Sequence, residues 1–584
     1  MPCKLPGFRK TLNHKGHEVT RRKSQYVGPP SCNFVSFVVK IVLGLLTAGL
    51  ALINAAQTLP ATESQSKFKA RAELVTVPVV VTDKSGVHVQ NLKKEDFVVL
   101  EDGKEQKVAT FEEIQTPAGP LRRTSPQPNQ FSNVVPGESS PTRLVMIVLD
   151  MINTPFEDQA YSKKQLLKYL GDTLDSSQPI SLMVITRSGL KVVHDFTTDP
   201  QVLIAALKKV QGQRQLVEEA SQEAIPGGGD QLSQEISSLM EFQQQSEQAM
   251  ESFQRRVAII DTLEAMQQIA QSAAGLPGRK ALIWASAGFP FSINDTTMVL
   301  TEGPRLDSLA DVLPLYEKTW KGLNQSQIAV YPVDVRGLVN PGFVNSQIRN
   351  PRSDYYSHAQ WQHTDTLGTF QVFAQATGGR AFYNTNDLSS AFRKAAEDNA
   401  SYYLLGYYLD RTGKKTGWHK LGVKVNHEKV QIRARSGFFL TPPETELNEK
   451  TALQLALNSR LAYTAIPITA RWQEVQPAAD GKKKVLFLLI LPKNSAEIDE
   501  ADNNHMSLEF AVLARIGAGT AADENSRTVE GHLKPDSVKK IRESGLDYHG
   551  ALTIPPGEYT VHFAVQDRIG GRIGSVIAPL KVAP

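Results

Sequence analysis

Cysteine is almost absent from this chain. Its 584 residues include two cysteines, Cys3 and Cys32, which both lie near the N-terminus. The body of the chain therefore has no disulfide framework, no cysteine-ligated zinc site and no cysteine nucleophile. The sequence also has no H-E-x-x-H motif and no glycine-rich P-loop. The usual residues of zinc proteases and of P-loop nucleotide hydrolases are thus missing.

A strong positive charge is missing from the body as well. The formal net charge is +4, but residues 1–56 alone carry +7, so the remaining residues carry −3. This sign disfavours a nucleic-acid partner. With 41% hydrophobic, 21% charged and 7% aromatic residues, the composition is that of a globular protein. The length predicts three or four domains.

Residues 1–56 have the composition of an export leader. A basic stretch precedes twenty mostly apolar residues, Phe34–Ile53, which are interrupted by Lys40. From Ile41 the apolar run is thirteen residues long, the length of a signal-peptide core. Taken whole, the run is long enough to anchor the chain in a membrane. We expect export to the periplasm, cell envelope or extracellular space, and leave both cleavage and membrane anchoring open.

A small β-domain is expected at residues 70–115. Leu74–Thr82 is a continuous β-branched run, and two shorter strands, Phe97–Leu100 and Lys107–Phe111, flank the turn sequence EDGK. Residues 116–142 are rich in proline and polar residues, which predicts a linker or a surface loop.

Residues 143–440 alternate between apolar runs and amphipathic stretches. Continuous apolar strands are typical of a sheet that is buried on both faces, so the pattern predicts a doubly wound α/β sheet. The expected strands are Arg143–Asp150, Ile180–Thr186, Lys191–Phe196, Lys280–Ser286, Ile328–Asp334 and Ala381–Tyr383. The expected helices are Gln159–Leu174, Pro200–Val210, Leu309–Leu323, Leu367–Ala376 and Leu388–Asn399.

A glutamine-rich insertion interrupts this domain at residues 211–275. It contains the flexible Gly227–Gly229 and two stretches with helical spacing of apolar residues. We expect two helices that form a peripheral hairpin beside the sheet, exposed to solvent. The apolar positions are Leu232, Ile236 and Leu239 in the first helix and Ile260, Leu263 and Met266 in the second.

Residues 450–584 change to short strands separated by Pro-Gly and Gly-Gly turns. In Tyr559–Gln566 apolar and polar residues alternate, as in a half-buried antiparallel strand. The segment is expected to form an immunoglobulin-like β-sandwich. The other expected strands are Val485–Leu491, Ser507–Leu513, Tyr548–Ile554 and Arg572–Val582.

Several stretches resemble the von Willebrand factor A-related proteins of Acidobacteria. They cover most of residues 70–440 and read VTVPVVVTDKSGVHVQNLKKEDFVVLEDGKEQKVATFEE, RLVMIVLDMINTPF, GRKALIWASAGFPF, AVYPVDVRGL and YYLLGYYL followed by GWHKLGVKV. The resemblance implies an exported protein with a doubly wound central sheet. In the broader fold family, a divalent cation sits above the carboxyl ends of the central strands and completes its ligand shell with a partner's carboxylate.

The resemblance implies candidate metal ligands at those strand ends. The family motif is Asp-x-Ser-x-Ser, and this chain has DMINT from Asp150 to Thr154. Asp150 and Thr154 match, Asn153 partly compensates, and Ile152 offers no ligand. Ser286 stands where the fourth strand usually ends in aspartate. Asp150, Asn153, Thr154 and Ser286 are therefore the candidate ligands of Mg²⁺, Mn²⁺ or Ca²⁺. In the competing interpretation, backbone amides hold Asp150 in a degenerate site.

A serine hydrolase is the alternative from another functional class. Ser286, Asp334 and either His358 or His363 follow the chain order of α/β-hydrolases. Trp284 stands two residues before the serine, however, where the nucleophile turn requires glycine. We therefore name no catalytic residue and expect that the protein is not an enzyme.

Tyrosines at 402, 403, 407 and 408 could line a binding surface or pack in a core, and packing is the more frequent role of paired tyrosines in a strand.

The function expected from the sequence is that of an exported, envelope-associated protein that binds or assembles with a protein partner. Residues 1–56 would add a membrane contact if they are not cleaved, and no nucleic acid is expected.

Overall fold

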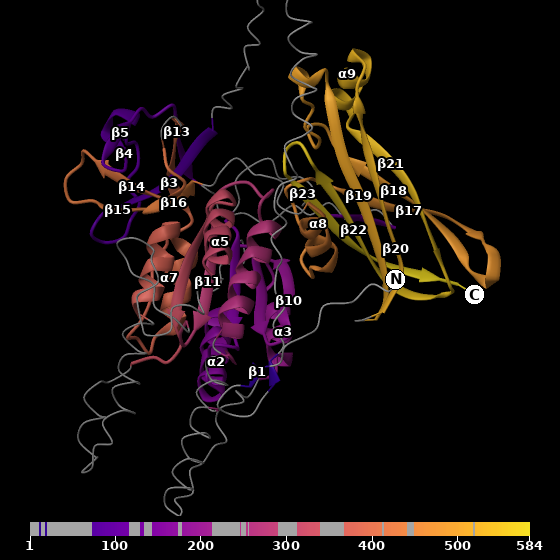
Figure 1. Ribbon diagram of the computed structural model, residues 1–584. Coiled ribbons are helices and arrows are strands. Elements are labelled where there is room, and N and C mark those ends of the chain that lie inside the picture. The colour runs from indigo at the N-terminus through magenta and orange to yellow at the C-terminus, as the bar shows by residue number, and fades with distance from the viewer. Residues whose placement is uncertain are drawn as a thin grey trace, which may run out of the picture. The chain divides into compact units, whose positions relative to one another are not determined.

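The structure is a computed structural model, and it describes most of the body of the chain (Figure 1). Apart from the paired β1 (Thr11–Leu12) and β2 (Glu18–Val19), the leader lies outside the described residues. Among the helices that are described, none is both long and apolar enough to cross a membrane. The described body comprises residues 73–115, 129–133, 143–172, 178–212, 246, 253–254, 256–289, 312–338, 367–410, 414–440, 449–517 and 520–583.

A five-stranded mixed sheet forms the centre of residues 143–400. Its strand order is β10-β9-β8-β11-β12, in which four strands run parallel and β10 pairs antiparallel with β9 at the edge. The parallel strands are buried along their whole length, which explains their continuous apolar sequences. The strands are β8 (Val145–Asp150), β9 (Ile180–Thr186), β10 (Gly189–Thr197), β11 (Lys280–Ser286) and β12 (Ile328–Asp334).

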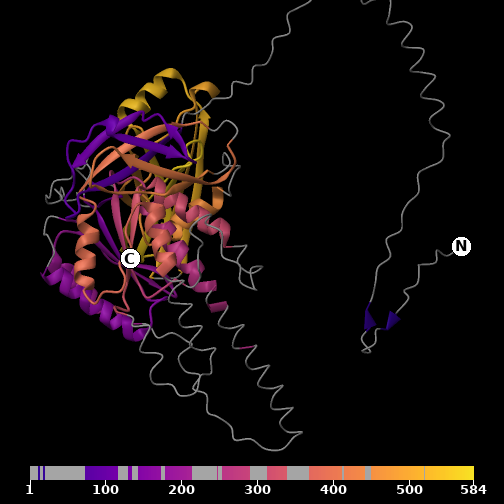
Figure 2. The same ribbon diagram turned by 90° about the vertical axis from the view of Figure 1, so that its left-hand side faces the viewer.

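Helices cover both faces of this sheet (Figures 1 and 2). One face packs against α2 (Phe156–Asp172), α3 (Pro200–Lys209) and α7 (Leu388–Glu397). The other face packs against α5 (Leu313–Gln325) and the helical segments 256–272 and 367–377. Alternate strand residues point to opposite faces, so each strand contributes to both cores. The predicted class, α/β together with β-domains, is confirmed.

The prediction of a peripheral, solvent-exposed hairpin at residues 211–275 is wrong for its second helix. The segment 256–272 belongs to the central core, where Ile259, Leu263, Met266 and Ile269 are buried against the sheet. These four residues recur at spacings of three and four, so they form one apolar stripe that requires a buried partner. The first predicted helix and the glycines at 227–229 lie outside the described residues.

A two-sheet β-domain combines the beginning and the end of residues 73–440. The sheet orders are β15-β3-β13-β6 and β16-β14-β4-β5, and all pairings are antiparallel. The first four strands are β3 (Glu73–Thr82), β4 (Phe97–Glu101), β5 (Lys104–Gln106) and β6 (Thr110–Gln115), with the short helix η1 (Lys94–Asp96) before β4. The others are β13 (Ser401–Leu409), β14 (Gly417–Val425), β15 (Gln431–Ala434) and β16 (Gly437–Leu440).

These sheets do not follow the domain boundaries expected at residues 115 and 440. Residues 401–440 were expected to belong to the central domain, but their strands β13 to β16 complete the N-terminal β-domain. The physical reason is the shared core: Val77 and Val79 of β3 pack with Tyr403 and Leu405 of β13. The α/β sheet is therefore inserted in sequence between two halves of one β-domain.

The C-terminal residues form two antiparallel four-stranded sheets with orders β21-β18-β17-β7 and β20-β19-β22-β23 and one shared core. Strand β7 (Gln130–Ser132) comes from the predicted linker 116–142 and pairs with β17. The remaining elements are α8 (Glu449–Asn458), β17 (Thr469–Pro477), η4 (Ala479–Gly481), β18 (Lys483–Leu491), η5 (Glu500–Asp502), β19 (His505–Ile516), β20 (Thr520–His532), α9 (Pro535–Ser544), β21 (Leu546–Ile554), β22 (Gly557–Asp567) and β23 (Ile573–Val582).

Candidate functional site

Three buried polar residues end neighbouring strands of the central sheet. Asp150 ends β8, Ser286 ends β11, and Asp334 ends β12 directly beside Ser286. Each is at most 1% exposed. Because parallel strands present their carboxyl ends on one edge, Asp150 and Ser286 come close enough for a direct hydrogen bond of 3.1 Å. The side chains at the ends of β8, β11 and β12 therefore lie at one edge of the sheet, as expected from the sequence.

Hydrogen-bond donors surround the Asp150 carboxylate. Its Oδ1 accepts from the backbone N–H groups of Ile152 (3.2 Å) and Asn153 (3.1 Å). Its Oδ2 accepts from Asn153 Nδ2 (2.8 Å), the Trp284 indole Nε1 (3.0 Å) and Ser286 Oγ (3.1 Å). Five donors thus converge on one buried carboxylate. Burial raises the pKa of this carboxyl group, and the hydrogen bonds oppose that rise.

The other candidate ligands also have partners within the protein. Thr154 Oγ1 accepts the backbone N–H of Ala287 at 3.1 Å. Asn153 Nδ2 also donates to Thr262 Oγ1 at 2.9 Å, which ties the loop after β8 to the helical segment 256–272. Sequence reasoning missed Thr262, and also Trp284 as a donor to Asp150. Neither had a local signal, because both residue types are ordinary inside buried elements.

A cation held by Asp150 fits this arrangement poorly. Both carboxylate oxygens already accept hydrogen bonds, and the indole N–H of Trp284 donates only and has no lone pair for a metal. Ile152 is apolar where the family motif places a hydroxyl ligand. The contacts therefore favour the interpretation in which donors hold Asp150. The metal site at Asp150, Asn153, Thr154 and Ser286 stays a prediction, tested below by divalent-ion titration.

Ser286 lacks the surroundings of a catalytic nucleophile within the described residues. Its side chain is buried, and its single hydroxyl proton is shared between Asp150 Oδ2 at 3.1 Å and the carbonyl oxygen of Gly288 at 2.7 Å. Asp334, the proposed triad acid, instead accepts two hydrogen bonds from the Arg336 guanidinium, Nε to Oδ1 at 2.9 Å and Nη2 to Oδ2 at 2.8 Å. The candidate bases His358 and His363 lie outside the described residues.

The tyrosines of β13 mainly pack inside the protein. Tyr402, Tyr403 and Tyr407 are buried, whereas Tyr408 is exposed. The Tyr403 hydroxyl donates to the carbonyl of Val89 at 2.8 Å, which ties β13 to the loop after β3. These contacts agree with packing and leave only Tyr408 on the surface.

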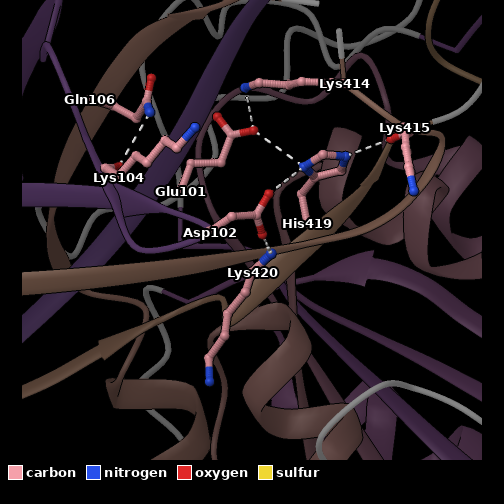
Figure 3. A network of polar contacts seen from close by, with 8 residues as sticks. All are labelled: Glu101, Asp102, Lys104, Gln106, Lys414, Lys415, His419 and Lys420. Atoms are coloured by element: carbon pink, nitrogen blue, oxygen red, sulfur yellow. Dashed lines mark hydrogen bonds and ion pairs between the residues drawn. The ribbon is translucent and has the colours of Figure 1, made fainter.

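A second polar cluster, which sequence reasoning did not identify, lies in the β-domain (Figure 3). Glu101 ends β4, Asp102 begins the turn before β5, and His419 lies on the adjoining strand β14. His419 Nδ1 is 2.7 Å from Asp102 Oδ2 and 3.4 Å from Glu101 Oε1. Lys414 Nζ forms an ion pair with the same Oε1 at 2.5 Å. The turn was visible in the sequence, but its histidine partner is 317 residues away.

Comparison of the chain with models of known protein families gave no match, and comparison with curated proteins gave none. The function proposed below therefore rests on the geometry of this chain and on the sequence stretches quoted above.

Proposed function

We propose that this chain is an exported, cell-envelope-associated protein that binds or assembles with a protein partner through a von Willebrand factor A-like central domain. The observation that carries the proposal is that, among the described residues, the polar side chains at the carboxyl edge of the central sheet are bonded to one another. Parallel α/β sheets bind ligands where the strand order reverses, and here that point lies beside β8 and β11. Asp150 and Ser286 occupy it, but both are buried and bonded to their own neighbours. A domain in which these two side chains are already bonded would bind its partner through residues on its surface.

The strand orders support the finer fold assignment. The chain leaves β8 toward β9 and β10, then crosses to β11 and β12 on the other side, with β10 antiparallel. Phe382 adds a parallel bridge beyond β12, at Val333. In the C-terminal domain, counted from β17, the first, second and fifth strands share one sheet with β7, and the other four share the second sheet. This arrangement supports an immunoglobulin-like sandwich.

Export and partner binding are tested together in intact cells. Treatment with a membrane-impermeant cross-linker should join the full chain to one protein partner and give a discrete adduct of higher mass. The matched control is the chain without residues 1–56, which should stay in the cytoplasm and give no adduct. An identical adduct from both chains, or none from either, would contradict the proposal.

The hydrolase alternative predicts a different result. A fluorophosphonate probe should not label the full chain, because the Ser286 hydroxyl is buried and donates its proton to Asp150 or to the Gly288 carbonyl. Labelling is read by intact-mass spectrometry, with Ser286→Ala as the matched control. Stoichiometric labelling of the wild type that the Ser286→Ala variant loses would establish the nucleophile and overturn the binding proposal.

A further inference from the structure

The cluster of Glu101, Asp102 and His419 brings two carboxylates and an imidazole together at one point of the β-domain. One ligand atom from each residue lies within 4.8 Å of the other two. Two backbone hydrogen bonds hold Asp102 in place. Asp102 Oδ1 accepts the backbone N–H of Lys420 at 2.8 Å, and the Asp102 N–H donates to the Lys420 carbonyl at 2.8 Å. Asp102 Oδ2 is thereby left to face the histidine.

The orientation of His419 points to a cation. Its Nε2 lies 2.8 Å from the backbone carbonyl oxygen of Lys415, which can only accept, so Nε2 carries a proton. Nδ1 then faces the carboxylate oxygens of Asp102 and Glu101 (Figure 3). A bare nitrogen lone pair would be repelled by those oxygens. The 2.7 Å between Nδ1 and Asp102 Oδ2 is a hydrogen-bond distance, so a metal ion bound to both atoms would require Asp102 to move outward. A histidine that donates its other N–H to a backbone carbonyl is the usual arrangement of a metal ligand.

Glu101 provides an independent indication. Its side chain is 1% exposed, and its Oε2 atom accepts no hydrogen bond of ordinary geometry from the described residues, although the buried Tyr407 hydroxyl is close enough that Glu101, after burial itself, raises the pKa of that tyrosine. A buried carboxylate oxygen without a full hydrogen bond is costly, and a bound cation would offset part of that cost. Its other oxygen lies 3.4 Å from His419 Nδ1, which is about the ligand separation in a tetrahedral site with bonds of about 2.1 Å. The Asp102 side chain is 49% exposed, so it can shift and leaves the cluster open to solvent.

We propose that Glu101, Asp102 and His419 bind Zn²⁺, and that the ammonium group of Lys414 competes for the same position. Imidazole and carboxylate together are a ligand set that zinc accepts, with water in the fourth position. Lys414 neutralises Glu101 when the metal is absent, and its side chain is 23% exposed, so it can turn into solvent as the ion enters. This proposal is independent of the partner-binding function.

The test uses the full chain, freed of metal by a chelator and titrated with Zn²⁺ by calorimetry. The wild type should bind one zinc ion per chain, and Zn²⁺ should raise its melting temperature. His419→Asn should abolish this binding. Lys414→Met should bind zinc about tenfold more tightly, because the competing cation is gone. Co²⁺ in place of Zn²⁺ should give visible absorption bands that His419→Asn removes.

His505→Asn provides the matched control. His505 lies in the C-terminal sandwich, 3.2 Å from Glu530 and beside His532, and this partly exposed cluster is the alternative place for zinc. The variant should bind zinc as the wild type does. The proposal fails if neither wild type nor Lys414→Met binds zinc, or if binding is lost in His505→Asn and kept in His419→Asn. If His419→Asn does not fold, Asp102→Asn takes its place, with the same loss expected.

Discussion

Replacing Asp150 with alanine is expected to lower the free energy of unfolding of the central domain by about 3–5 kcal/mol. The substitution removes the common acceptor of five donors and leaves the Trp284 indole and the Asn153 amide without their Asp150 contact. Buried donors without a partner cost about 1–3 kcal/mol each, offset in part by relaxation of the loop. Urea unfolding followed by tryptophan fluorescence measures the change. The exposed neighbour Glu157 gives the control, because Glu157→Ala should shift stability by less than about 0.5 kcal/mol.

Divalent ions separate the two interpretations of Asp150. If donors hold the carboxylate, the loss in Asp150→Ala is the same with and without millimolar Mg²⁺ or Mn²⁺. A metal-dependent rise in melting temperature that the wild type shows and Asp150→Ala lacks would instead establish a cation at this residue. A rise that survives in Asp150→Ala would come from another site, such as the cluster around His419.

Lys280 should make the stability of the central domain rise from pH 7 to pH 9. This lysine begins β11, is 1% exposed, and donates from Nζ to the carbonyls of Leu276 and Gly278 at 2.7 Å each. Burial lowers its pKa from 10.5 to about 7. Between these values the unfolded chain binds a proton that the folded chain does not, so unfolding becomes less favourable as pH rises.

The expected size is large for a single residue. Over pH 7 to 9 the wild type should gain about 2 kcal/mol relative to Lys280→Met, which has no titratable group at this position. Below about pH 7 both states hold the proton, so the difference between the two proteins should level off. Urea unfolding at several pH values measures the two curves. Parallel curves would show that Lys280 stays charged in the folded protein.

The central strands could be predicted from sequence because their environment constrains their composition. Lys280–Ser286 and Ile328–Asp334 were expected with the boundaries that β11 and β12 have. A strand buried on both faces must be apolar throughout, so the chain itself marks its start and end. Strands β17 and β20 were not predicted. Both carry many polar side chains, so they lack that local signal.

The candidate sites were predictable only in part. Asp150 and Ser286 follow apolar runs, and the rule for parallel sheets places them on one edge. Whether donors or a cation hold Asp150 depends on Trp284 and Thr262, whose roles arise only when β11 and the helical segment 256–272 pack beside β8. Amphipathic spacing predicted that helix, but spacing does not say which surface its apolar stripe covers.

Local sequence by itself determined which buried, apolar segments become strands and helices, and where the buried parallel strands end, because hydrophobic periodicity acts between near neighbours in the chain. Only the tertiary structure decided that β3 pairs with β13, that β7 leaves the linker for the C-terminal sheet, and that His419 meets Glu101 and Asp102. These contacts join residues hundreds of positions apart. They are selected by the burial of whole strand faces against one another, which no local pattern records.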